Sequence, residues 1–167
     1  MFMFHNDYNE GCHPEILKQL EQMNSRQMDG YGADDCCSRA AQLIRSQCNR
    51  NDLAVHFLVG GTQTNLTVID AVLRPHQAVL GAASAHINVH ETGAVEATGH
   101  KILTAPNADG KICPEQIRSI LAEHTDIHVT KAAMVYISQP TELGTLYTLA
   151  ELEALRKVCD ENGLYLY

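Results

Sequence analysis

The sequence predicts an α/β fold with a mostly parallel sheet, because short apolar strands alternate with amphipathic helices along the chain. Two segments support this most clearly. Residues 132–138 are apolar enough to form a strand covered on both faces. Residues 148–161 carry leucine and valine at helical spacing. The composition, 45% apolar and 19% charged, is that of an ordinary globular protein.

Helical periodicity predicts the helices of this fold, which we expect over residues 14–23, 33–49, 62–73, 86–97, 114–122 and 148–161. The first has Pro14 in its opening turn, where proline is tolerated. Its expected buried stripe consists of Ile16, Leu17 and Leu20. Asn162-Gly163 ends the last helix, since glycine readily closes a helix C-terminus.

Short apolar runs predict the strands, which we expect over residues 55–59, 78–80, 101–104 and 132–138, with a further strand beginning at 164. Asn107-Ala108-Asp109-Gly110 is a predicted turn. The last helix should direct four apolar side chains into the core, namely Leu149, Leu152, Leu155 and Val158.

Charge and composition exclude several classes of partner. The formal net charge of -8 argues against general binding to nucleic acid or to anionic membranes. No apolar run approaches the roughly 20 residues that span a bilayer. The start, Met1 to His5, lacks the basic region of a signal peptide. The six cysteines include no Cys-x-x-Cys pair, so we expect free thiols in a reducing cytoplasm.

The segment Val59-Gly60-Gly61-Thr62-Gln63-Thr64-Asn65 is a candidate anion site. It follows a predicted strand and opens a predicted helix, so free backbone N–H groups and the helix dipole point to one spot. Thr62 can cap the helix or donate its hydroxyl. A plain strand–turn–helix corner is the alternative. No lysine follows Gly61 until Lys101, which excludes a P-loop, and the three spaced glycines of a dinucleotide site are absent.

A second candidate cluster contains His86, His90 and Glu91. On a continuous helix, His86 and His90 would share one face and form a possible metal pair. Two separate polar contacts are the alternative. The order His-Glu-x-x-His of metalloproteases is absent, and we predict no metal site.

The chain resembles the threonine aldolase and β-eliminating lyase family of pyridoxal-phosphate enzymes, through motifs that occur in the family's order over its whole length. These are Asn6-Asp7-Tyr8 with Gly11 and His13-Pro14-Glu15; Gly30-Tyr31-Gly32; Gly61-Thr62-Gln63-Thr64-Asn65; Ala85 to Glu96 with Thr98-Gly99-His100-Lys101; and Gln139 to Tyr147.

The resemblance implies a truncated form of the large domain of a fold-type-I pyridoxal-phosphate enzyme, a three-layer fold with a mostly parallel sheet. Residues 1–50 would form an N-terminal arm with helices, and 51–167 the first part of the cofactor-binding domain. Family members are about twice as long. Their Schiff-base lysine, and the aspartate that pairs with the pyridine nitrogen, would follow Tyr167. The strand at 55–59 would be separated from the others by two strands that come later in the family's chain.

The resemblance also implies roles for individual residues around pyridoxal 5'-phosphate. His86 would stack on the cofactor ring and assist proton transfer, with Glu91 as a second catalytic group. Many family members have a tyrosine at the position of His90 and a second histidine at that of Thr141. Gly61 and Thr62 would hold the phosphate, and the substrate would contact Asn6, Tyr31 and His90.

The function implied for the full-length protein is cleavage of a threonine-like β-hydroxy-α-amino acid to glycine and an aldehyde, in a homodimer or homotetramer. The alternatives are a catalytically inactive fragment, another β-eliminating amino-acid lyase of the same family, and a metal-dependent hydrolase using His86, His90 and Glu91. We expect the chain alone to be inactive, because none of its five lysines is placed to bind the cofactor: Lys18, Lys101, Lys111, Lys131 and Lys157.

Overall fold

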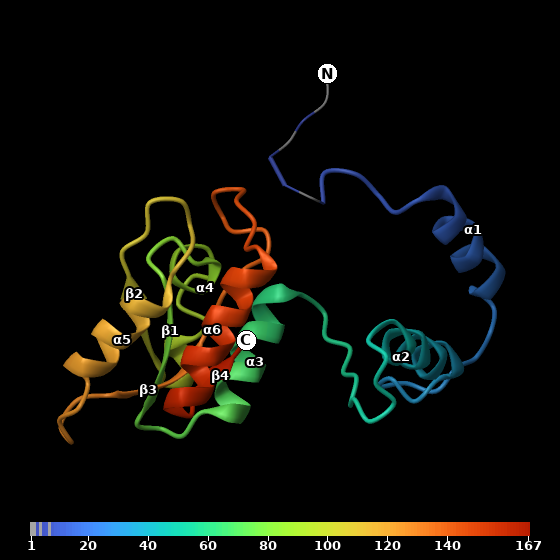
Figure 1. The fold of residues 1–167 in the computed structure, drawn as a ribbon. Coiled ribbons are helices and arrows are strands. Elements are labelled where there is room, and N and C mark those ends of the chain that lie inside the picture. The colour runs from blue at the N-terminus through green and yellow to red at the C-terminus, as the bar shows by residue number, and fades with distance from the viewer. Residues whose placement is uncertain (1–2, 4, 7) are drawn as a thin grey trace. The chain divides into compact units, whose positions relative to one another are not determined.

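A computed structural model of the chain describes residues 3, 5, 6 and 8–167 (Figure 1). Asp7, part of the first motif, lies outside the described residues. The chain divides into two compact units, Met1–Phe57 and Leu58–Tyr167. The roles expected for residues 1–50 and 51–167 stay predictions. Of the helices that the structure describes, none is long and apolar enough to cross a membrane.

The first unit contains helices α1 (Pro14–Met23) and α2 (Asp35–Gln47). The bounds predicted for α1 are confirmed. Its buried stripe is wrong, because Ile16, Leu17 and Leu20 are 51%, 56% and 57% exposed. Ala41 is the sole buried residue in either helix. This unit therefore has too little apolar surface of its own to cover the stripe.

The second unit is built on a four-stranded parallel sheet in the order β2-β1-β3-β4, which confirms the predicted α/β class. The central strands β1 and β3 are almost wholly buried, as expected for a parallel sheet covered on both faces. The strands span Gln77–Ala82 (β1), Lys101–Ala105 (β2), Lys131–Val135 (β3) and Tyr165–Leu166 (β4).

Helices cover this sheet (Figure 1). The connections β2–α5–β3 and β3–α6–β4 run in the same direction across the sheet, so right-handed crossovers place α5 and α6 on one face. These two helices pack against each other. The connection from β1 to β2 runs the opposite way and carries α4 and η1. The bounds are Gly61–Val72 (α3), His86–Val89 (α4), Glu96–Thr98 (η1, a 3-10 turn), Pro114–Glu123 (α5) and Leu149–Asn162 (α6).

The strand predicted at 55–59 is wrong. In the part of the chain that the structure describes, these residues pair with no strand and run as irregular backbone into α3. An apolar run becomes a strand only when a neighbour accepts its hydrogen bonds. The sheet leaves this run without such a neighbour.

Two other predictions need correction. The helix predicted over 86–97 ends at Val89, because Thr92 and Gly93 take positive φ angles of 54° and 75°. Leu149 is 72% exposed rather than buried, since it is the first residue of α6. The rest of that stripe faces the core as predicted, with Leu155 and Val158 buried and Leu152 half-buried.

Candidate active site

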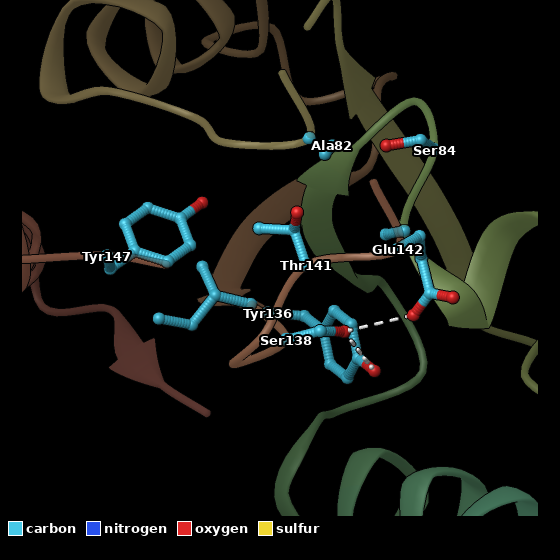
Figure 2. A pocket seen from close by; sticks show the side chains of 10 residues that line it. Ala82, Ser84, Tyr136, Ser138, Thr141, Glu142 and Tyr147 are labelled. Atoms are coloured by element: carbon cyan, nitrogen blue, oxygen red, sulfur yellow. Dashed lines mark hydrogen bonds between the residues drawn. The ribbon is translucent and has the colours of Figure 1, made fainter. Parts of the chain in front are cut away.

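The candidate site lies where β1 and β3 end, at Ala82 and Val135. Figure 2 shows a pocket at this edge, with Ser138 and Glu142 beside Tyr136. Ligand sites of open parallel sheets form at the carboxyl ends of strands. The edge therefore has the expected location for a binding site.

The turn that follows β1 is fixed by side chains, and this fixes the position of His86. Asn107 accepts a hydrogen bond from the Ser84 backbone N–H (3.1 Å) and donates one to the Ser84 hydroxyl (2.9 Å). Asn88 donates to the carbonyl of Ala83 (2.7 Å). Helix α4 begins directly after this turn. His86 is thus held one short turn beyond the end of β1.

His86 belongs to a hydrogen-bonded cluster around the buried carboxyl group of Glu91. His86 Nδ1 lies 2.7 Å from Glu91 Oε1, and Asn65 Nδ2 donates to the same oxygen (2.5 Å). The Tyr167 hydroxyl donates to Asn65 Oδ1 (2.8 Å). The Glu91 side chain is fully buried, whereas that of His86 is 40% exposed. The cluster therefore fixes one edge of the imidazole and leaves the rest of the ring accessible.

Helix α3 brings the glycine corner into the same region. Its N-cap is Gly60, so of the two roles predicted for Thr62, capping the helix is wrong, and donation of its hydroxyl to an anion stays a prediction. The first helical hydrogen bond joins Thr64 N to Gly60 O (3.0 Å). The amides of Gly61 and Thr62 precede it and have no acceptor within the helix. Asn65, one turn further on, ties this end of α3 to Glu91.

A second polar group continues the site from β3. The Tyr136 hydroxyl lies 3.2 Å from the Ser138 hydroxyl, and Ser138 donates to Glu142 Oε1 at 3.5 Å (Figure 2). Burial raises the pKa of Tyr136, and also that of Tyr167. Both phenols therefore stay protonated near neutral pH and act as hydrogen-bond donors.

The hydroxyl of Thr141 is engaged in hydrogen bonds within its own loop and to the loop after β2. Thr141 is buried, and its hydroxyl lies 2.7 Å from that of Thr145 and 3.4 Å from the carbonyl of Asp109. Tyr147 is also structural, since its buried hydroxyl accepts the N–H of Ile112 (2.9 Å).

The remaining predicted residues are only partly brought together. The ring of His90 lies 5.5 Å from that of His86, centroid to centroid, but His90 caps the end of α4 instead of continuing a long helix. Asn6 and the exposed Tyr31 belong to the first unit, and their roles stay predictions. Among the described residues, no group of three or more His, Cys, Asp or Glu side chains is arranged to hold a metal ion.

Sequence reasoning gave no role to Asn65 or Tyr167. Asn65 was recognisable as part of the glycine motif, four positions after Gly61 and hence on the same side of α3. No sequence pattern indicated a role for Tyr167, because its hydrogen-bond partner Asn65 lies 102 positions earlier in the chain.

The fold is that of the large domain of fold-type-I pyridoxal-phosphate enzymes. A threonine aldolase of Leishmania major superposes with a TM-score of 0.95 at 49% identity, covering 96% of this chain and 47% of its own. An archaeal alanine:glyoxylate aminotransferase superposes with a TM-score of 0.68 at 17% identity, over 91% of this chain and 38% of its own. The latter likeness concerns the fold alone.

The sequence model of the β-eliminating lyase family matches residues 11–167, and the chain belongs to this family. A low-specificity L-threonine aldolase of a Pseudomonas species is 34% identical over 166 residues, which are 98% of this chain and 48% of that protein. The enzyme of the same name from Saccharomyces cerevisiae is 27% identical over 82% of this chain and 36% of its own length. The chain thus spans about half the length of the relatives that it matches most fully.

Proposed function

We propose that the whole protein containing this chain is a pyridoxal-phosphate-dependent aldehyde lyase that cleaves a threonine-like β-hydroxy-α-amino acid to glycine and an aldehyde. One observation carries the proposal: an accessible imidazole, fixed by a buried carboxyl group, lies in one cluster with the glycine-rich start of α3. The similarity to threonine aldolases supports it.

The residues present fit this cofactor. A Cβ atom added at Gly60 or Gly61 would meet no atom within 4 Å, so a phosphate has room to approach the amides of α3. The cofactor, when bound, supplies an electron sink for the bond broken at the substrate's α-carbon. Gly61 and Thr62 would hold its phosphate, and the imidazole of His86 would lie against its ring.

The chain's own residues would then orient groups and hold protons. Glu91 fixes the His86 ring through Nδ1. Nε2 is left as the atom that takes up or returns a proton at the substrate. Asn6, Tyr31 and His90 are proposed substrate contacts.

A second candidate is another β-eliminating lyase of the same family. It is favoured by Thr141, whose buried hydroxyl is engaged with the loop and supplies no acid–base group to the site. The two candidates differ in the bond that breaks. Aldol cleavage of threonine breaks the Cα–Cβ bond and gives glycine and acetaldehyde, whereas elimination expels a leaving group from Cβ and gives a keto acid and ammonia.

The test is a product analysis of the whole purified protein with added cofactor. We expect visible absorbance from bound cofactor, and equal amounts of glycine and acetaldehyde from L-threonine. O-acetylserine, offered in parallel, should give no pyruvate. Pyruvate from O-acetylserine without glycine from threonine would favour the second candidate. Failure of the protein to bind the cofactor would refute both candidate functions. A catalytically inactive protein would then be the remaining alternative.

The proposal extends to assembly and location. We propose a homodimer or homotetramer in the cytoplasm, supported by the exposed apolar stripe of α1 and by six free cysteines, which suit a reducing compartment. Sedimentation of the whole protein tests the assembly, and a single monomeric species at micromolar concentration would refute it.

A further inference from the structure

A continuous hydrogen-bonded path joins the end of the last strand to the catalytic candidate His86. It runs from the Tyr167 hydroxyl to Asn65 Oδ1 (2.8 Å), from Asn65 Nδ2 to Glu91 Oε1 (2.5 Å), and from Glu91 Oε1 to His86 Nδ1 (2.7 Å). Its four members come from the residue directly after β4, the first turns of α3, the loop after α4, and the start of α4.

The direction of each proton follows from the chemistry of the groups. Asn65 Nδ2 donates to Glu91 Oε1. His86 Nδ1 lies against the same oxygen, which fits a second donor at that position. The Asn65 amide then turns its nitrogen to Glu91 and its oxygen to Tyr167. Because burial raises the pKa of Tyr167, the phenol keeps its proton and donates it to that oxygen. Each bond thus fixes the orientation of the next group.

We propose that Asn65 and Tyr167 are positioning residues that hold Glu91 so that neutral His86 carries its proton on Nδ1 and keeps Nε2 free. The inference deepens the proposed function and rests on it for its catalytic meaning. Neutral imidazole has two tautomers, and the partner of one nitrogen decides which of them is present.

Glu91 needs this support because its carboxyl group is held on one side only. Its side chain is fully buried, and among the described residues Oε2 has no hydrogen-bond partner. Without the Asn65 donor, rotation of the carboxyl group would exchange its two oxygens with little opposition. The other titratable groups near this carboxyl group are Tyr136 and Tyr167, with His90 beside the His86 ring. None of these three donates to Glu91 in the structure.

The test is nitrogen NMR of the whole protein, prepared without cofactor and with ring-¹⁵N histidine, at a pH where imidazoles are neutral. His86→Gln assigns the signal. We expect mainly the Nδ1–H tautomer in the unaltered protein. Asn65→Asp and Tyr167→Phe should each lower the ratio of Nδ1–H to Nε2–H about fivefold, the usual effect of one hydrogen bond. Tyr165→Phe, at an exposed tyrosine of β4 two residues before Tyr167, is the matched control and should change nothing.

The inference is overturned if His86 is mainly Nε2–H in the unaltered protein, or if Tyr167→Phe leaves the ratio unchanged. Should Asn65→Asp fail to fold, Tyr167→Phe decides the matter, because it removes one hydroxyl and keeps the ring that packs on Tyr136. The measurement needs no cofactor. A changed tautomer in a protein that does not cleave threonine would therefore refute the proposed function and leave this inference intact.

Discussion

His86 and His90 lie at the two ends of the same short helix, yet their surroundings differ. His86 is fixed by a buried carboxyl group, whereas the structure gives His90 a ring contact with His86 and a backbone role at the helix end. In the whole protein, His86→Ala should lower kcat for threonine cleavage about 10²–10⁴-fold, the usual loss for a positioned acid–base group. His90→Ala should cost less.

Steady-state kinetics and cofactor absorbance of both variants check this prediction. Cofactor occupancy should fall much less than turnover in His86→Ala, because the start of α3 is unaltered. Normal turnover in His86→Ala together with a large loss in His90→Ala would mean that the wrong histidine has been chosen.

Gly110 is required where the loop after β2 meets Thr141. Its φ is +87°, and an added Cβ would lie 2.6 Å from Thr141 Oγ1 and 2.8 Å from Thr141 Cβ. Gly99 is a matched control, with φ +88° and no atom within 4 Å of an added Cβ. Both alanine variants share the backbone strain, so Gly110→Ala should lose about 1–3 kcal/mol of unfolding free energy more than Gly99→Ala. Thermal unfolding of the whole protein measures the difference. Equal losses of unfolding free energy in the two variants would show that the loop rearranges to accommodate the added methyl group.

The sequence predicted site roles for His86 and Glu91 because a recognisable motif contains both. It could not show that they touch, since their contact depends on the break after Val89. That break comes from the positive φ of Thr92, which helical periodicity does not predict. The hydrogen bond between Asn65 and Tyr167 was beyond prediction, because a contact across 102 positions exists only once the sheet has formed.

At the scale of elements, helix α6 is stabilised at its N-terminus by Glu151. This carboxylate accepts hydrogen bonds from the Thr148 backbone N–H (2.6 Å) and from Lys111 Nζ (3.0 Å), which together lower its pKa to about 2. A lowered pKa stabilises the fold above the unfolded value of 4.5, and the gain is lost as the pH falls from there toward 2.

Glu151→Gln should therefore lower the Tm of the whole protein at pH 7, and the difference should shrink progressively below the unfolded pKa. Glutamine keeps the shape of the capping box, so the pH-dependent part of the Tm difference reports the loss of the Glu151 charge. Glu153→Gln removes an exposed charge from the same helix and should have little effect at either pH. A Tm difference for Glu151→Gln that does not vary with pH would contradict the assignment.

Elements with local signals were predicted closely, and elements that depend on a partner were not. Pro14 at the start of α1 and Gly163 at the end of α6 set helix limits from within the sequence. The run at 55–59 has the composition of a strand but pairs with none of the described strands. Composition gives the tendency to form a strand, and the sheet decides whether the strand exists.

At the scale of the whole molecule, the location of the lysines bears on activity. The site lies at the carboxyl ends of β1 and β3, whereas Lys101 and Lys131 are the first residues of their strands, at the opposite edge of the sheet. Lys111 is bound to Glu151 (3.0 Å), and Lys157 lies 4.0 Å from Glu161 on α6. No lysine of the second unit is thus directed at the candidate site.

We therefore predict that the 167-residue chain, purified alone and supplied with cofactor, does not form glycine from threonine, while the whole protein does. Without a lysine of the second unit directed at the site, the start of α3 and His86 would bind and orient the cofactor but could not begin the reaction cycle. The alternative is that Lys111 attaches the cofactor, and Lys111→Ala in the chain tests it. On our prediction this variant leaves any background rate of glycine formation unaltered. Steady glycine production by the unaltered chain, lost in Lys111→Ala, would show that Lys111 leaves Glu151 to act at the site, and the whole-protein argument would fail.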